Sequence, residues 1–230
     1  MRIVLFDIDG TLLTSDGAGR RSMERALTEV FGSPGSSEYH YGGKTDRQIV
    51  RDLMRREGFT DDAIDAQMDQ LLESYVAGLA TELESGDRTM LLLDGVLELL
   101  DALDREERVV VGLLTGNIET GARAKLTAAG IDPARFRVNA FGSDHELRPE
   151  LPAVAQRRAS ELLGIDVRGN RLVIIGDTPG DIQCGEAIGA RAIAVATGSY
   201  TVEQLAAYQP YALFESLANT SAVLTSIMNA

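Results

Sequence analysis

Short apolar runs alternate with helical patterns along most of this chain, and this alternation limits the fold more than any other feature. Each run is apolar at every position rather than at alternate positions, which is typical of strands covered on both faces. The clearest runs lie at residues 3–6, 109–114, 172–175 and 192–196, with a weaker one at 211–214. Helical patterns lie between them, at residues 95–103, 119–129 and 152–163. The sequence therefore predicts an α/β fold with a parallel sheet.

One long segment interrupts the alternation. Between residues 15 and 85 there are only helical patterns, at 22–31, 45–57 and 61–83. Gly17 and Gly19 precede this block, and Ser85-Gly86 follows it. We therefore predict an all-helical domain at residues 15–86, inserted into a core made of residues 1–14 and 87–230. Helices packed directly on the core are the alternative.

The composition of the 230-residue chain excludes several classes of partner. Its formal net charge of −13 disfavours binding to nucleic acid or to an anionic membrane. No apolar run approaches the length that spans a bilayer, and the N-terminus lacks the pattern of a signal peptide. A single cysteine, Cys184, cannot form an internal disulfide. A cytoplasmic location is expected.

Two acidic residues, Asp7 and Asp9, directly follow the first predicted strand, in Asp7-Ile8-Asp9-Gly10-Thr11. In open α/β sheets, ligands bind beyond the carboxyl ends of the strands. Two carboxylates this close need a cation between them or a shared proton. Both arrangements suit a nucleophile paired with an acid/base, while a simple Asp-Gly turn is the alternative.

The second and third motifs also follow predicted strands. Thr115-Gly116-Asn117 offers a hydroxyl, a close backbone approach and an amide at a helix start, which together suit a phosphate group. Asn117 as a plain helix cap is the alternative. Asp177 and Asp181 lie in Gly176-Asp177-Thr178-Pro179-Gly180-Asp181, where oxygen ligands suit Mg²⁺.

A phosphate site in so acidic a chain needs its own positive charge. Only two of the 22 basic residues are lysines, Lys44 and Lys125. Arg148, just before a predicted helix, is the best candidate for this cation. Arg157 and Arg158 lie within that helix, where arginines are usually solvated.

Taken in this order, these motifs resemble the haloacid dehalogenase superfamily, from Asp7 to about Gly198. The resemblance implies a Rossmann-like three-layer core with a helical cap domain, as in phosphoglycolate phosphatase-like enzymes. It implies Asp7 as a nucleophile that becomes an aspartyl-phosphate, Asp9 as general acid/base, and Thr115 as a partner of the phosphoryl group. The backbone of Gly116 and Asn117 would also bind that group.

By the same resemblance, Mg²⁺ is the cofactor. Its ligands would be Asp7, Asp177 and the Asp9 carbonyl, with Asp181 supporting the site. Arg148 stands where the superfamily most often has lysine, and one extra residue precedes its second proline. On the cap, Lys44, Thr45 and Arg47 are predicted to contact the leaving group, with a solvated loop as the alternative.

The resemblance implies a Mg²⁺-dependent phosphatase for a small phosphorylated metabolite. Asp9 argues against the dehalogenases, which lack an acid there. A sugar phosphomutase remains the main alternative, beside a phosphonate hydrolase, which would need Lys44 for a Schiff base, and an inactive phosphate-binding protein. The substrate and the oligomeric state, with a homodimer as one option, stay open.

Overall fold

The computed structural model describes residues 1–84 and 90–230. Within them, six parallel strands form one sheet in the order β5-β4-β1-β6-β7-β8. Their bounds are β1 Arg2–Phe6, β4 Val109–Thr115, β5 Val138–Phe141, β6 Leu172–Gly176, β7 Arg191–Val195 and β8 Ala212–Phe214. The predicted parallel sheet is confirmed.

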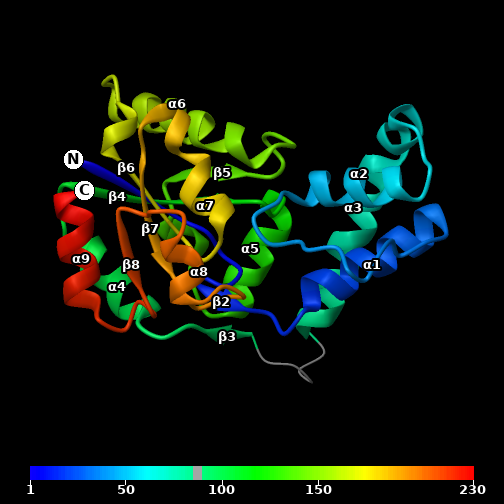
Figure 1. Cartoon of the computed structure of the whole chain (residues 1–230), viewed down its shortest axis with the longest axis horizontal. Helices are drawn as coiled ribbons and strands as arrows, with labels where there is room; N and C mark the ends of the chain where they lie inside the picture. The colour runs from blue at the N-terminus through cyan, green and yellow to red at the C-terminus, as the bar shows by residue number, and fades with distance from the viewer. Residues whose placement is uncertain (85–89) are drawn as a thin grey trace.

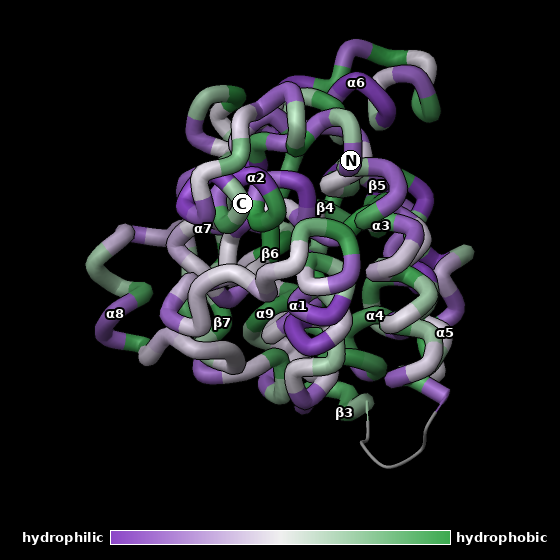
Figure 2. The backbone as a smooth tube through the Cα atoms, turned by 90° about the vertical axis from the view of Figure 1, so that its right-hand side faces the viewer, coloured by the Kyte–Doolittle hydropathy of each residue, from purple (hydrophilic) through white to green (hydrophobic). Residues whose placement is uncertain are grey.

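Strand β1 lies inside the sheet, paired with β4 on one side and with β6 on the other. Val4 stands opposite Val111 in β4 and opposite Val173 in β6. Successive side chains of a strand point to opposite faces, so a strand that is apolar throughout must be covered twice. Figure 2 shows these strands as apolar segments enclosed by helices with polar stretches.

Helices cover both faces of the sheet and complete a three-layer core (Figure 1). On one face, α4 (Val96–Asp104), α5 (Glu119–Ala128) and α9 (Thr220–Asn229) pack against alternate residues of β1 such as Val4 and Phe6. On the other face, α6 (Leu151–Leu163) and α7 (Pro179–Cys184) pack against Ile3 and Leu5. The short helix α8 (Val202–Ala206) packs beside β7. The three-layer α/β fold is thus confirmed.

Two parts of the sheet structure are absent from the predicted pattern. Strand β5 reads Val-Asn-Ala-Phe, and its central asparagine breaks the apolar run. Asn139 accepts a hydrogen bond from the backbone N–H of Leu113 and donates one to the carbonyl of Phe136, so this polar residue helps to hold the edge strand. The strands β2 (Leu13–Thr14) and β3 (Leu91–Leu92) form a separate antiparallel pair of two residues each.

Three helices form the cap: α1 (Ala18–Phe31), α2 (Asp46–Arg56) and α3 (Asp61–Glu84). They enclose an apolar cluster of their own, to which the core adds Ile118. The cap lies beyond the carboxyl ends of the strands (Figure 1). Its predicted limits at residues 15 and 86 stay a prediction, because residues 85–89 lie outside the described part. Among the described helices, none is long and apolar enough to cross a bilayer.

Candidate active site

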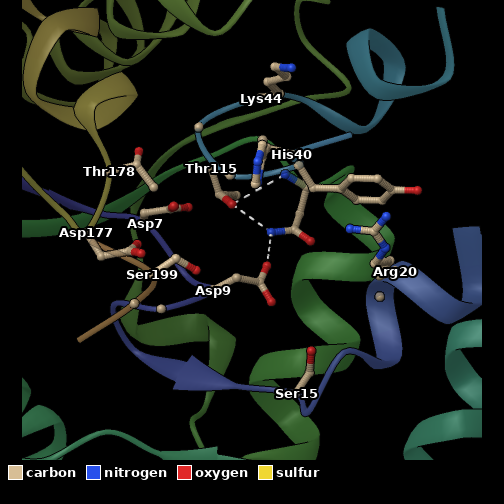
Figure 3. Close-up of a pocket in the computed structure, with 18 of the residues that line it drawn as sticks. Asp7, Asp9, Ser15, Arg20, His40, Lys44, Thr115, Asp177, Thr178 and Ser199 are labelled. Carbon is tan, nitrogen blue, oxygen red and sulfur yellow. Dashed lines mark hydrogen bonds between the residues drawn. The ribbon is translucent and has the colours of Figure 1, made fainter. Parts of the chain in front are cut away.

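The carboxyl ends of β1, β4 and β6 bring the three sequence motifs into one cavity (Figure 3). Asp7 follows β1, Thr115 ends β4, and Asp177 follows β6. All three line a cavity of about 720 Å³, together with residues of the cap. The parallel sheet therefore positions these side chains, as ligand sites of open α/β sheets require.

Asp7 is a buried carboxylate with a cation beside it. Its side chain lies 3.2 Å from Nη2 of Arg148. Burial raises the pKa of Asp7 to about 6; Arg148 opposes this shift, whereas Asp181 and Asp9 add to it. Asp7 is thus held close to a cation in a site that otherwise disfavours its negative charge.

Asp177 is the second buried acid of this group. Burial, Asp181 and Asp7 together raise its pKa to about 8. The hydroxyl of Thr11 donates a hydrogen bond to Oδ1 at 3.2 Å. Two glycines let the backbone approach the carboxylate: an added Cβ would lie 2.5 Å from Oδ2 at Gly10, where φ is +80°, and 1.7 Å from it at Gly198.

Asp181 joins these two acids, but protein donors already occupy its oxygens. Oδ2 accepts from the backbone N–H of Thr178 at 3.0 Å and from its hydroxyl at 2.6 Å. The first of these bonds, together with the bond from the N–H of Asp181 to the Thr178 hydroxyl oxygen, forms a capping box at the start of α7. Oδ1 accepts from Arg148. Asp181 therefore anchors both α7 and the arginine.

The donor set of this group fits Mg²⁺. Oxygens of Asp7, Asp177 and Asp181 lie within 4.8 Å of one another, and all three residues are buried. Arg148 contacts two of them, Asp7 and Asp181. Hard divalent cations prefer such carboxylate oxygens. Both oxygens of Asp181 already accept hydrogen bonds from protein donors, so Asp7 and Asp177 are the stronger candidates to hold an ion.

Arg148 is a buried cation that links the ends of β1 and β4 to helix α7. It lies in a 3₁₀ turn, Arg148–Glu150, directly before α6. Its Nη2 contacts Asp7 and Asp181 and donates to the carbonyl of Leu114. Although burial works against its charge, Asp181 and Asp7 raise the pKa of Arg148.

The two neighbouring arginines are placed differently. Arg157 is exposed and lies 3.9 Å from Glu161, and Arg158 pairs with Asp144 at 2.6 Å. Neither lines the cavity.

The Thr115-Gly116-Asn117 segment forms one wall of the cavity. The hydroxyl oxygen of Thr115 accepts from the side-chain amide of Asn117 at 2.8 Å. The same amide nitrogen donates to Oδ2 of Asp9, also at 2.8 Å. Ile118, not Asn117, is the cap residue of α5. Asn117 thus joins Thr115 to Asp9.

Asp9 points away from Asp7 and Asp177, toward α5 (Figure 3). Its two oxygens lie 2.8 and 2.7 Å from Nζ of Lys125, and the same ammonium donates to Oδ1 of Asn117 at 2.7 Å. Sequence reasoning missed Lys125. The available signal is a rare lysine eight residues, about two helical turns, after Asn117.

The predicted cap contacts are brought to the cavity unequally. The loop at Lys44 lines the cavity, but its ammonium lies 3.7 Å from the centre of the Tyr39 ring, and its side chain points away from Asp7 (Figure 3). Thr45 is buried and donates to the carbonyl of Glu146. Arg47 faces Asp69 at 3.5 Å and does not line the cavity.

The loop that precedes α2 and contains Lys44, here called the cap loop, docks on the core at the Thr115-Gly116-Asn117 segment. The backbone N–H of Asp46 donates to the carbonyl of Gly116 at 2.9 Å, and Oδ2 of Asp46 accepts from the N–H of Ile118 at 2.8 Å. Burial raises the pKa of Asp46 to about 6, and Lys125 opposes the shift. From the cap side, the cavity is lined by residues that include Arg20, His40, Tyr41 and Tyr75.

Two curated proteins resemble this chain at the same level of sequence identity. N-acylneuraminate-9-phosphatase of Mus musculus is 27% identical over 252 residues, which span 99% of this chain and 95% of the relative. Phosphoglycolate phosphatase of Rhodospirillum rubrum is also 27% identical, over 95% of this chain and 88% of the relative.

The fold has relatives among solved structures as well. A hydrolase from Pseudomonas syringae superposes with a TM-score of 0.75 at 20% identity, covering 99% of both chains. The model of the haloacid dehalogenase-like hydrolase family matches residues 4–186, which hold all three motifs of the cavity and the cap helices. With most of its length matched in this way, the chain belongs to the haloacid dehalogenase-like hydrolases.

Proposed function

We propose that this hydrolase is a Mg²⁺-dependent phosphatase that acts on a small phosphorylated metabolite through an aspartyl-phosphate on Asp7. One observation carries the proposal: the buried carboxylate of Asp7 lies close to both Arg148 and Asp177, in a cavity that Asp9 also lines. Both curated relatives are phosphatases, which supports the same reaction class.

In the first step, an oxygen of Asp7 attacks phosphorus, the bond from phosphorus to the leaving oxygen breaks, and Asp9 gives a proton to that oxygen. In the second step, water attacks the phosphorus and gives a proton back to Asp9, the bond from phosphorus to the Asp7 oxygen breaks, and inorganic phosphate leaves with Asp7 restored as a carboxylate. Arg148 offsets negative charge as the two anions approach. Asp7 and Asp177 would hold Mg²⁺, which supplies further positive charge at the phosphoryl group.

The cavity between cap and core indicates the size of the substrate. At about 720 Å³ it falls in the range of small-molecule sites. Cap residues such as Arg20, Tyr41 and Tyr75 line the same cavity as Asp9, and the leaving group would lie among them. We therefore propose phosphoglycolate and N-acylneuraminate 9-phosphate, the substrates that the relatives' names indicate, as the first compounds to test.

The test is phosphate release from a panel of phosphorylated metabolites by the purified protein with Mg²⁺, with chelator, and with Asp7→Asn. We expect turnover with Mg²⁺ and background rates in the other two samples. Undiminished hydrolysis after chelation, or by Asp7→Asn, would show that the mechanism is wrong.

The same assay separates hydrolysis from phosphoryl transfer between sugar hydroxyls. A phosphatase releases inorganic phosphate and needs no bisphosphorylated sugar to start turnover, and this is the expected result. An isomerised sugar phosphate that appears faster than inorganic phosphate would favour a phosphomutase. The position of the Lys44 ammonium, on the Tyr39 ring, argues against a phosphonate hydrolase that needs a Schiff base.

A further inference from the structure

Lys125 is a buried charged residue that the mechanism above leaves without a role. We propose that it is a positioning residue that fixes the carboxylate of Asp9 on the leaving-group side of the cavity, so that the proton passes along a set direction in both steps. The inference rests on the proposed function, because it takes Asp9 to be the general acid/base.

The ammonium of Lys125 contacts the carboxylate of Asp9 and the side chain of Asn117. Its ammonium lies 2.7–2.8 Å from both carboxylate oxygens and 2.7 Å from Oδ1 of Asn117. The ammonium has three donors, and these three acceptors match them in number. Asn117 in turn donates to Oδ2 of Asp9 and to the hydroxyl oxygen of Thr115. Asp9 is thereby tied to the wall that would hold the phosphoryl group.

Without these partners Asp9 would be free to turn. The Asp9 side chain is 41% exposed to the cavity, whereas that of Lys125 is 4% exposed. A carboxylate on a solvent-accessible loop samples several rotamers. In all but the productive rotamer, the Asp9 proton lies too far from the leaving oxygen to be transferred to it. The lysine is the rigid member of the pair, so the orientation is imposed on Asp9 from α5.

A purely structural salt bridge is the competing explanation for Lys125. Burying an ammonium costs several kcal/mol before its partners compensate. If position 125 held an apolar residue, it could pack beside its buried neighbours Ala122 and Leu126 on α5 without that cost. Lys125 also lines the cavity, although its side chain is almost fully buried. These facts favour a role at the site, and the experiment below separates the two explanations.

The test compares two leaving groups. Phosphoglycolate releases an alkoxide, which needs a proton as the bond to phosphorus breaks, and p-nitrophenyl phosphate releases a stable phenolate, which needs none. Since kcat/KM covers only the steps up to leaving-group departure, it isolates the acid role of Asp9. General acid–base catalysis contributes about 10²–10⁴-fold. For Lys125→Met we expect kcat/KM to fall about 10- to 100-fold with phosphoglycolate and less than threefold with p-nitrophenyl phosphate.

Two further variants sharpen the result. Lys125→Gln keeps a donor without the charge and should regain part of the lost rate, with thermal melting as the check on folding. Arg123→Met is the matched control on the same helix, where the arginine is half-exposed and pairs with Glu119 at 2.8 Å. We expect it to match the wild type with both substrates.

A double-mutant cycle distinguishes the outcomes. If Lys125 acts through Asp9, Lys125→Met adds no further loss in an Asp9→Asn background. An additive loss would mean that Lys125 binds the substrate itself, and an equal loss with both leaving groups would mean a structural role; each overturns the inference. Wild-type rates in Lys125→Met alongside an impaired Asp9→Asn overturn the inference alone. Wild-type rates in Asp9→Asn overturn both it and the acid/base assignment of the proposed function.

Discussion

At the scale of single residues, Arg148 contacts two buried carboxylates, Asp7 and Asp181, with one guanidinium nitrogen. Removing it leaves both acids without their cation, and the charge that develops in phosphoryl transfer without a fixed partner. Loss of such a preorganised group typically costs about 10²–10³-fold in turnover. We expect Arg148→Ala to lose kcat by this amount in a steady-state phosphate-release assay, and Arg148→Lys to recover part of it.

The matched control is Arg157→Ala, because Arg157 is exposed on the helix that follows. It should keep wild-type kcat. Thermal melting must accompany both assays, since unpaired buried carboxylates also destabilise a fold. Normal turnover in a folded Arg148→Ala would exclude Arg148 as the catalytic cation.

Sequence reasoning succeeds at this scale where a residue lies inside a motif at a strand end. Asp7, Thr115 and Asp177 are located by the strands that precede them, and the parallel sheet brings them together. Lys125 lies in no motif, and its partner Asp9 is 116 positions away. Lys125 and Asp9 come together through the way α5 packs on the sheet, and no local sequence pattern encodes this packing.

At the scale of elements, the cap loop meets the core at a glycine. An added Cβ at Gly116 would lie 1.9 Å from the carbonyl oxygen of Lys44, a distance that the two backbones cannot accommodate. We expect Gly116→Ala to hold the cap loop away from the core and to lower kcat/KM at least tenfold with phosphoglycolate.

Gly121→Ala, on the helix α5 that follows Gly116, is the control. Its added Cβ would lie 3.5 Å from Leu79, an ordinary contact, and alanine is the better helix former. It should leave kcat/KM unchanged. Equal activity of the two variants would show that close docking of the cap loop is not needed for turnover.

A second prediction at this scale concerns Asp46, which joins α2 to the start of α5. Its pKa of about 6 in the folded protein lies above the ordinary 3.8. The folded state therefore binds the proton more tightly, and this contribution to stability is complete below pH 3.8 and is lost as pH rises through about 6. Asp46→Asn has no carboxylate to ionise and does not lose this contribution. The free energy of unfolding of the variant minus that of the wild type should therefore increase by at most about 3 kcal/mol between pH 4 and pH 7.

Urea unfolding of both proteins at several pH values in this interval measures the difference. The asparagine can still accept from the N–H of Ile118, so the helix contact is retained. A stability difference that stays the same at every pH would contradict the placement of Asp46 as a buried carboxylate.

The elements themselves were predictable to a useful degree. Continuous apolar runs identify β1, β4, β6 and β7, because a doubly covered strand needs no polar residue. Strand β5 escapes the pattern since Asn139 replaces an apolar residue and satisfies its neighbours with its own side chain. The packing of the cap helices on one another is readable from their periodicity, but the contacts of the cap loop with the core are not.

At the scale of the whole molecule, metal binding should stabilise the fold. Burial, and after it repulsion from neighbouring carboxylates, raises the pKa values of Asp7 and Asp177, and a bound divalent cation would offset both effects. An ion at about 100 times its dissociation constant adds about 2.7 kcal/mol. For a chain of this size, a rise of about 5–10 °C in the melting temperature follows.

Calorimetry with and without Mg²⁺ measures this shift independently of any substrate. We expect most of it to vanish in Asp177→Asn and to persist in Asp62→Asn, a change at an exposed position on α3. An equal shift in both variants would place the ion elsewhere.

The docking of the cap on the core uses main-chain atoms at its centre. Asp46 reaches Gly116 through its N–H, and an added Cβ on Gly180 would lie 3.0 Å from the Cα of Gly43. Backbone groups are the same whatever side chains flank them. Changes of cavity-lining cap side chains such as Tyr41 are therefore expected to alter substrate preference while these main-chain contacts stay in place.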